Sequence, residues 1–475
     1  MITHEILSQY EPTIGIECHV QLKTATKLFS GADNDAREAA PNTTVSPICF
    51  GLPGTLPVLN KSAVALAIRA GIALNAEIAH VSSFDRKHYF YPDLPKGYQI
   101  TQLERPIVGQ GKIDVPLDGG TFEVRITRAH MEEDAGKLTH PGGADYSLVD
   151  LNRAGTPLVE VVSEADMKSP EQAKAFAQEL YLLMKFAGVS EANLYHGNMR
   201  FDVNISVAKK GAKAWGTRVE IKNLNSFRSV EKAAEFEYRR QVELIEKGET
   251  IVQETRGWDD SKQKTFSQRS KEEAQDYRYF PDADIPPIVL DDEVIAAQRN
   301  AMPLLPPEFR ARWQPLGLDQ SVINALLSSL ASANAVTQVQ ATAGDEAAKR
   351  VAHWFSSTVT NSEQDEPNNE DANISGDIDT ASLIELATMA EKSEVSSTAA
   401  KDIFKRFMQT GESPRAIAEE QNLLQVSDSG EIEAIVDQVL ADPSAQKAVE
   451  DIKAGNDKAI GFLVGQVMKL SKGKA

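Results

Sequence analysis

The sequence predicts a domain of mixed strands and helices over about residues 1–290, followed by helical segments. In the first part, several stretches alternate apolar with polar residues, which is the period of a half-buried strand, and stretches with helical spacing lie between them. Beyond about Leu290 the alternation fades and helical spacing dominates. Three prolines among the aspartates of Pro281–Pro287 indicate the edge of the first domain.

The composition is that of a soluble globular protein. The chain has 475 residues, of which 41% are hydrophobic and 25% charged. The longest apolar run, Ala63–Leu74, contains Arg69 and Gly71, so no membrane span is expected. The start, Met1–Glu5, lacks the basic beginning of a signal peptide, so we expect a cytosolic protein.

The charge and the cysteines exclude some classes of function. A formal net charge of -19 argues against a protein that coats nucleic acid through its overall charge, although an RNA substrate remains compatible with it. Two cysteines, Cys18 and Cys49, are too few for a disulfide framework or a four-thiolate zinc site.

The stretch Ile14–Leu22 has the clearest strand pattern. Its apolar residues fall at every second position, which places Glu17 and His19 together on the opposite face. Two strand positions span about 6.6 Å, so both side chains could reach one divalent ion. The alternative is an ordinary exposed polar face.

An aromatic segment follows the predicted helix Lys61–Leu74. In Lys87–Tyr98, aromatic rings and prolines alternate with charged groups. Rings beside a lysine suit a base and its phosphates, and the equal alternative is a loop that packs on the core.

Acidic residues come after the strand predicted at Thr121–Thr127. Here His130 precedes the acids Glu132, Glu133 and Asp134. Such a cluster repels itself unless cations or hydrogen bonds neutralise it, so the pattern indicates either a metal site or a solvated acidic turn.

The next elements are an apolar strand and two capped helices. The strand is predicted at Leu158–Val162. Ser169 begins one helix, which Gly188 ends, and a long charged helix runs over residues 226–247.

Two further strands repeat the design of the first. Their polar faces carry Arg200 and Asp202 on one strand, and Arg218, Glu220 and Lys222 on the other. If all these strands belong to one sheet, its polar face brings acids for divalent ions beside cations for phosphate. That combination suits phosphoryl transfer.

Towards the carboxyl end, the run 356–380 is rich in Asn, Asp, Glu and Ser and predicts a mobile insertion or long loop. Helical spacing returns over 431–440 and 458–469.

Several long stretches resemble one family, the B subunits of bacterial aspartyl/glutamyl-tRNA amidotransferases. The resemblance extends over the whole first domain and continues into the tail. The stretches that carry it are 14–20, 88–102, 130–137, 150–160, 197–207, 217–228, 276–287, 401–404, 410–414, 424–428 and 461–468.

The resemblance implies an α+β catalytic domain over 1–290, built as a glutamine-synthetase-like cradle on a largely antiparallel sheet. A helical domain over 291–400 and a small helical tail over 401–475, which contacts tRNA, would follow. It also implies ATP- and Mg²⁺-dependent amidation of Glu-tRNA(Gln) or Asp-tRNA(Asn) in a bacterial cytoplasm. The side-chain carboxylate would be phosphorylated, and ammonia would displace the phosphate. The ammonia would come from the amidase, or A subunit, which a small C subunit would strap to this chain in a heterotrimer.

Carried over residue by residue, the resemblance implies a metal site and a substrate site. His19, Glu17, one of Glu132 and Glu133, and Glu220 would bind Mg²⁺, with Asp202 as a further acidic member. Lys222 and Arg200 would contact phosphate. Tyr89, Tyr91 and Lys96 would contact the nucleotide or the aminoacyl end.

The chain departs from the family pattern at a zinc site. Many members hold zinc with four cysteines, whereas here Ser30, Ala32 and Ser46 stand at three of those positions and only Cys49 remains. We therefore expect no structural zinc. Two other classes of function stay open on the sequence, a tRNA-binding scaffold with structural acids and a stand-alone ligase that amidates a small acid.

Overall fold

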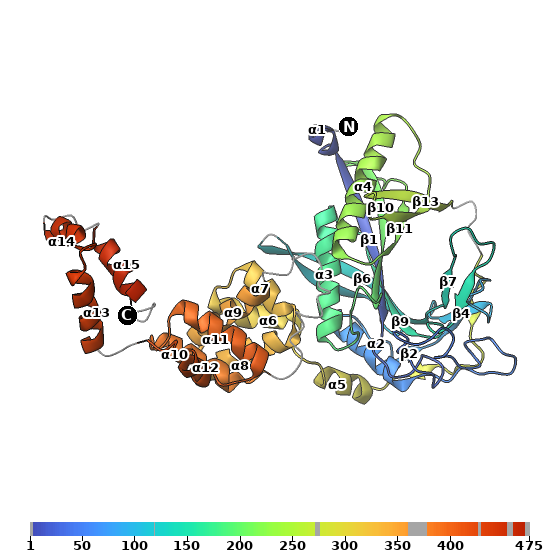
Figure 1. Cartoon of the computed structure of the whole chain (residues 1–475). Coiled ribbons are helices and arrows are strands. Elements are labelled where there is room, and N and C mark those ends of the chain that lie inside the picture. Colours follow the sequence, from blue (N-terminus) through green and yellow to red (C-terminus); the bar gives the residue numbers. More distant parts are fainter. Residues whose placement is uncertain are drawn as a thin grey trace. The chain divides into compact units, whose positions relative to one another are not determined.

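The computed structural model describes residues 3–117, 119–270, 276–359, 378–425, 429–453 and 459–470. The chain divides into two compact units, one up to Pro306 and one from Pro307 onward (Figure 1). The first is built on a large sheet and the second is helical. The predicted order, an α+β domain followed by helical segments, is confirmed.

The first unit contains an eight-stranded sheet that unites all the strands predicted to carry polar side chains. Neighbouring strands are antiparallel except β11 and β12. In spatial order the strands are β13 (Lys264–Ser270), β12 (Glu254–Asp259), β11 (Val219–Leu224), β10 (Met199–Lys209), β1 (Tyr10–Gln21), β9 (Pro157–Ser163), β6 (Gly120–Glu133) and β5 (Gly111–Leu117).

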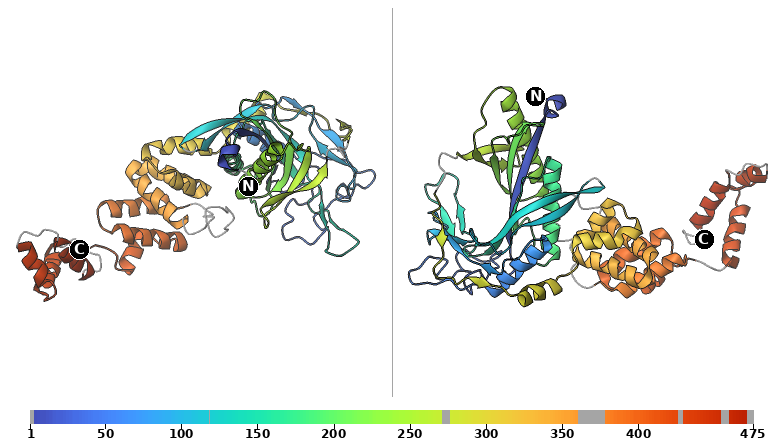
Figure 2. Two further views of the ribbon diagram at one scale, coloured as in Figure 1. Left: turned by 90° about the horizontal axis from the view of Figure 1, so that it is seen from above. Right: turned by 180° about the vertical axis from the view of Figure 1, so that it is seen from behind.

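One face of this sheet is buried by helices. Figures 1 and 2 show α3 (Pro170–Phe186) and α4 (Phe227–Glu246) along this face, and α2 (Lys61–Ala73) contacts β6. The apolar side chains of β1, such as Ile16 and Cys18, are fully buried in a cluster that includes Phe176 of α3. The alternation in Ile14–Leu22 therefore decides which face of β1 is core, and it leaves Glu17 and His19 on the other face.

Helix ends follow the capping signals. The hydroxyl of Ser169 accepts a hydrogen bond from the Gln172 N–H, and Gly188 follows the helix with φ +66°. The hydroxyl of Ser226 caps α4 in the same way. The helices predicted at these two places are confirmed.

Short strands lie beside the large sheet. Strand β3 (Asp85–His88) pairs with β4 (Tyr98–Thr101) and with β14 (Phe280–Pro281), and β4 contacts β6. The remaining pairs are β2 (Val81–Ser82) with β15 (Ile288–Val289), and β7 (Lys137–Thr139) with β8 (Leu148–Asp150).

The second unit consists of short helices. Helices α7 to α12 form one packed group, in which α11 and α12 contact each other and α10, and the last three helices contact one another. The helices of the chain not yet named are α1 (His4–Leu7), α5 (Asp292–Asn300), α6 (Pro306–Trp313), η2 (Gln314–Leu316), α7 (Gln320–Leu327), α8 (Leu330–Ala343), α9 (Asp345–Val359), α10 (Thr380–Glu391), α11 (Ser397–Thr410), α12 (Pro414–Glu420), α13 (Ser429–Ala441), α14 (Gln446–Lys453) and α15 (Ile460–Leu470).

The unit boundary lies beyond the predicted edge at 290. Helix α5 contacts α2, Arg69 donates a hydrogen bond to Gln298, and Ile295 packs on the core of the first unit. The first unit therefore extends to Pro306. The predicted division at 400 falls inside α11, whose apolar face contacts the preceding helices, so that place is not a linker.

The predicted insertion at 356–380 is wrong at its start. Residues 356–359 are the last turn of α9, and the hydroxyls of Ser357 and Thr358 donate to carbonyls of the preceding turn, which lets polar residues stay helical. Residues 360–377 lie outside the described residues.

Within the described ranges, no single helix is long and apolar enough to cross a membrane. Helices α7 and α8 meet those criteria of length and composition only when joined, and they are bent by 117° at their junction.

Candidate functional site

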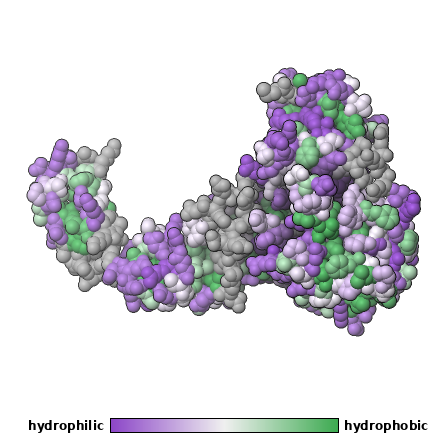
Figure 3. All heavy atoms as spheres, turned by 45° about the vertical axis from the view of Figure 1, so that its right-hand side comes forward, coloured by the Kyte–Doolittle hydropathy of each residue, from purple (hydrophilic) through white to green (hydrophobic). Residues whose placement is uncertain are grey.

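The uncovered face of the large sheet lines a cavity of about 530 Å³. Figure 3 shows a hollow in the first unit, with hydrophilic residues around it. The acidic residues of the lining come from five strands and one loop, and they are Glu17, Glu132, Asp134, Glu160, Asp202 and Glu220. The lysine and arginine residues of the lining are Lys87, Arg200 and Lys222.

The register of three adjacent strands brings two histidines to one glutamate. On the central strand β9, Glu160 lies opposite His19 of β1 and opposite His130 of β6. The Glu160 carboxylate is 3.0 Å from His130 Nε2 and 3.9 Å from His19 Nε2. Directly opposed residues on one face are close neighbours, so the pairing itself builds this group.

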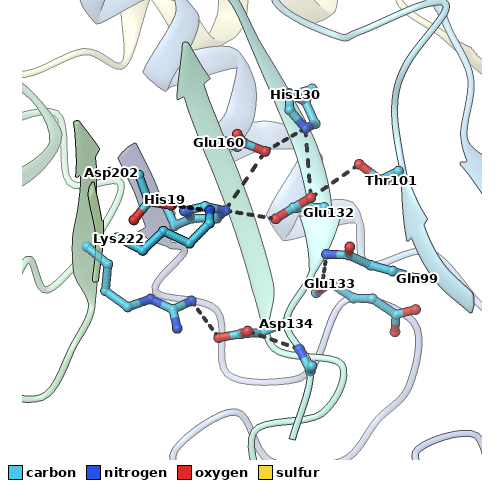
Figure 4. Close-up of polar contacts among 12 residues, drawn as sticks. His19, Gln99, Thr101, His130, Glu132, Glu133, Asp134, Glu160, Asp202 and Lys222 are labelled. Atoms are coloured by element: carbon cyan, nitrogen blue, oxygen red, sulfur yellow. Dashed lines mark hydrogen bonds and ion pairs between the residues drawn. The ribbon is translucent and has the colours of Figure 1, made fainter. Parts of the chain in front are cut away.

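Glu132 completes this group from β6. Its carboxylate is 3.4 Å from His19 Nε2 and 3.8 Å from His130 Nε2, and it accepts a hydrogen bond from Thr101 (Figure 4). The ligand atoms of His19, Glu132 and Glu160 lie within 4.8 Å of one another. We call these three residues the histidine group.

The electrostatics of the histidine group follow from burial and from mutual pairing. Burial alone lowers the pKa of an imidazole, but the neighbouring carboxylates raise the pKa of His19 and of His130 to about 9. Burial likewise opposes ionisation of Glu160, but His130 lowers its pKa to about 2. Hydrogen bonds from His130 and His19 hold the pKa of Glu132 well below its usual range against the effect of burial.

A second group lies on the other side of β1. Glu17, Asp202 and Glu220 place their carboxylate oxygens within 4.8 Å of one another, and we call them the carboxylate group. Glu17 lies opposite Asp202 in the pairing of β1 with β10. Burial raises the pKa of Glu17, and the carboxylates of Glu160 and Glu220 raise it further.

Lys222 lies inside the carboxylate group. Its ammonium is 2.7 Å from Glu220 and 3.0 Å from Asp202. Burial lowers the pKa of a lysine, but these two carboxylates raise that of Lys222. The amide of Asn204 donates to Glu17, and the hydroxyl of Thr255 donates to Glu220. This wall of the cavity is therefore already partly neutralised.

The structure places Glu17 and His19 in different candidate groups. Their spacing along β1 predicted one shared ion, and that remains a prediction, while their ligand atoms lie with different neighbours. His19 reaches toward β9 and β6, and Glu17 reaches toward β10 and β11.

The two consecutive glutamates of β6 point to opposite faces. Strand β6 continues through Glu133, so both glutamates lie in the strand and not in a solvated turn, which was one of the two alternatives from the sequence. Glu132 enters the histidine group, whereas Glu133 pairs with Lys96 and accepts from the Ile100 N–H. Because side chains alternate along a strand, Glu132 faces the large cavity and Glu133 lies on the opposite face of β6.

Lys96 and Glu133 line a second, smaller cavity of about 20 Å³. That volume is enough for about one water molecule. Among the residues predicted to contact the nucleotide or aminoacyl end, only Tyr89 lines the large cavity. Tyr91 is 48% exposed and contacts the edge of the Tyr89 ring.

Arg200 is held in an ion pair. Its guanidinium is 2.9 Å from Asp134, which Arg153 also approaches at 3.3 Å. Arg200 lies opposite His19 in the strand pairing, so it borders both groups of acids.

Cys49 is buried at the edge of the smaller cavity. Its sulfur is 3.5 Å from the Lys27 ammonium and 3.4 Å from the hydroxyl of Ser46. Both neighbours are hydrogen-bonding groups. The expectation of no structural zinc remains a prediction.

Sequence reasoning missed Glu160, Tyr277 and the pairing of His130 with Glu160, and it noted Lys87 only as part of the aromatic segment that suits a base and its phosphates. Glu160 is the only charged residue in the otherwise apolar stretch 158–162, and that interruption was the available signal. Tyr277 reaches the cavity from a segment almost two hundred residues after Lys87, and no local pattern predicts that meeting.

The chemistry of both groups fits divalent cations. Carboxylate oxygens suit Mg²⁺, Mn²⁺ and Ca²⁺, and an imidazole beside carboxylates is an accepted ligand set for several divalent metals. The deeply buried acids of the histidine group also need positive charge nearby. Without a metal ion, His19 and His130 supply that charge, because the pKa of each imidazole is raised to about 9.

Comparison with known proteins gives matches along the chain. The chain matches the family described as GatB/GatE catalytic domain over residues 12–296, and the family described as GatB domain over residues 337–475. Similar proteins are named as the B subunit of aspartyl/glutamyl-tRNA(Asn/Gln) amidotransferase. The protein of Carboxydothermus hydrogenoformans is 44% identical over 479 residues, covering 99% of this chain and 97% of its own. That of Persephonella marina is 46% identical over 469 residues, with 98% and 97% covered.

Proposed function

This chain belongs to the family of aspartyl/glutamyl-tRNA(Asn/Gln) amidotransferase B subunits, and on this premise we propose that its large cavity phosphorylates a tRNA-bound carboxylate. The substrate is Glu-tRNA(Gln), Asp-tRNA(Asn) or both, and the product is the corresponding amide. ATP is the phosphoryl donor and Mg²⁺ the metal.

The chemical reason for phosphorylation is the poor reactivity of a carboxylate. An ionised carboxylate resists attack by ammonia and has no good leaving group. Transfer of the γ-phosphoryl group of ATP to the side-chain oxygen gives ADP and an acyl phosphate. Ammonia then attacks the carbonyl carbon, and phosphate leaves with the oxygen to which it was bonded.

The observation that carries the proposal is the pair of acid groups on neighbouring strands, facing one polar cavity. Phosphoryl transfer relies on positioning and charge neutralisation, with little covalent chemistry by the protein. When bound, Mg²⁺ would neutralise the triphosphate during transfer. His19, Glu132 and Glu160 would hold one ion, and Glu17, Asp202 and Glu220 a second.

The other residues of the lining have supporting roles in this proposal. Arg200 and Lys222 add positive charge beside the two acid groups. Tyr89 offers a ring surface for the base or the aminoacyl end. Glu133, Lys96 and Tyr91 are outside the proposed phosphoryl-transfer site, because none of them lines the large cavity.

We propose that the chain works in a heterotrimer with the amidase, or A subunit, and with a small C subunit. The word subunit in the names of its relatives supports an assembly of several chains. The amidase would hydrolyse glutamine and supply the ammonia, so this chain alone should use ammonium salts but not glutamine.

The test is ATP consumption by the complex. ADP should form only when ATP, Mg²⁺ and misacylated tRNA are all present, and ammonium should replace glutamine as nitrogen donor. Glu132→Ala should remove ADP formation and leave tRNA retention on a filter unchanged.

The outcomes separate the proposal from its alternatives. Full amidation by the Glu132→Ala complex would contradict the proposed site and favour a tRNA-binding scaffold. ADP formation with free aspartate or glutamate, equal to that with misacylated tRNA, would favour a ligase for small acids.

A further inference from the structure

We infer that Lys87 contacts the phosphoryl group that is transferred from ATP. This inference rests on the proposed function and adds a residue to it. Two observations support it. Lys222 and Arg200 in the same cavity are already paired with carboxylates, and aromatic rings hold Lys87 in place.

The other cationic side chains of the lining are already paired. Lys222 pairs with Asp202 and Glu220, and Arg200 pairs with Asp134. Lys87 forms no ion pair or side-chain hydrogen bond with any residue in the described parts of the chain, although it lines the same cavity. A charged ammonium in a partly closed cavity lacks a partner unless an anion binds there.

Two tyrosine rings hold the Lys87 ammonium. It lies 4.9 Å from the centre of the Tyr277 ring and 5.9 Å from that of Tyr89. These two rings meet edge to face, with centres 6.1 Å apart. Aromatic faces stabilise a cation without neutralising its charge, so the ammonium stays available to an anionic oxygen.

The segment that carries Tyr277 is bound to β3, which places the Tyr277 ring beside Lys87. The His88 N–H donates to the carbonyl oxygen of Tyr277 at 2.8 Å, and the His88 ring stacks on Phe280. Arg86 then pairs with Asp282 at 2.7 Å. The residues on either side of Lys87 in β3 therefore fix the segment that encloses it.

A phosphoryl group is the anion that suits this place. Glu132 and Glu160 act electrostatically on Lys87, so their acid group is close, yet neither carboxylate is within ion-pairing distance. If a metal ion held by the histidine group neutralised one side of the phosphoryl group, the negative oxygens on the other side could interact with Lys87.

Lys87 transfers no proton in the step that it assists. The bond between the γ-phosphorus and the bridging β–γ oxygen breaks, and ADP keeps that electron pair. A new bond forms between the substrate carboxylate oxygen and the phosphorus. Lys87 keeps its proton and interacts with the non-bridging oxygens throughout.

The test compares ATP with ADP, because only ATP carries the transferred group. Lys87→Met should weaken ATP binding to the purified chain about 10-fold and ADP binding less than 2-fold, measured calorimetrically. In the complex, the rate of ADP formation with saturating misacylated tRNA should fall about 100-fold. Lys87→Arg, which keeps the charge, should restore part of both losses.

Two further variants keep the test interpretable. Tyr277→Leu retains the lysine and should lower the rate less than Lys87→Met does. Lys112→Met removes an exposed lysine of β5 and should change neither value. If Lys87→Met keeps the parent ratio of ATP to ADP affinity and the parent rate, the inference is wrong. A parent chain that shows Lys87-dependent preference for ATP but forms no ADP would contradict the proposed function and still support the contact.

Discussion

Glu17 and His19 leave the same face of β1, yet their ligand atoms belong to two different groups. Strand β1 is therefore the boundary between the histidine group on β9 and β6 and the carboxylate group on β10 and β11. One strand that supplies a ligand to each side fixes the spacing between the groups. Two cations side by side can neutralise a triphosphate at more than one oxygen, which suits phosphoryl transfer.

Glu160→Gln should lower the rate of ADP formation by the complex at least 100-fold. The amide keeps the size of the side chain but removes the charge that His130 and His19 both approach. A steady-state ADP assay with misacylated tRNA measures the change. The matched control is Glu123→Gln, an exposed glutamate on β6 that pairs with Lys112. A Glu160→Gln complex as active as the control would exclude this residue from the site.

Without metal, the first unit should lose stability as the pH rises from about 6.5 to about 9. The pKa of His130 is raised to about 9 in the folded chain, against about 6.5 in an unfolded one. A raised pKa contributes stability that is complete below the unfolded value and is lost as the pH passes through the folded value. Thermal unfolding in EDTA across this range measures it.

The control for this pH dependence is a pair of histidine variants. His130→Gln should make the fall in melting temperature smaller, because only His19 would then keep a pKa raised to about 9, and His140→Gln, at an exposed position, should leave the fall unchanged. Parallel curves for the parent chain and His130→Gln would show that His130 is not the group responsible.

Lys96→Met should lower the free energy of unfolding by about 3–5 kcal/mol, because it leaves Glu133 buried without its partner. The two side chains are only 9% and 5% exposed. Replacing both, as Lys96→Met with Glu133→Gln, should recover part of the loss. Urea unfolding of the parent chain, the single variants Lys96→Met and Glu133→Gln, and the double variant measures this, and a double variant that loses the sum of both single losses would rule out the coupling.

Arg86→Met should lower the rate of ADP formation about 10- to 100-fold without abolishing tRNA binding. The change frees the segment that carries Tyr277, since the side chain of Asp282, the partner of Arg86, has no exposed surface. Arg278→Met, at a residue whose side chain is 81% exposed, is the control. Equal rates for both variants would mean that the docking of this segment is unimportant for catalysis.

Local patterns predicted the strands of the site but not all of its contacts. Alternation identified β1, β6, β10 and β11 and placed Glu17, His19 and Asp202 on polar faces, because burial of one face imposes a period of two. The same pattern continued through Glu132 and Glu133. Extending it would have separated these acids onto two faces.

What the sequence could not supply is the order of strands. Glu160 enters the site because β9 lies between β1 and β6, and Tyr277 enters because β14 pairs with β3. Both depend on pairings between segments far apart in the chain, which local periodicity does not encode. The boundary at Pro306 was missed for the same reason, since it depends on α5 packing against α2.

The central claim is that the tRNA-bound carboxylate is phosphorylated in this cavity before ammonia attacks. Misacylated tRNA with ¹⁸O in both oxygens of the side-chain carboxylate tests it most directly, in the complex with ATP, Mg²⁺ and ammonium. We predict that one labelled oxygen appears in inorganic phosphate for each amide formed, and that His19→Ala abolishes this transfer. Amide formation with unlabelled phosphate would contradict the account.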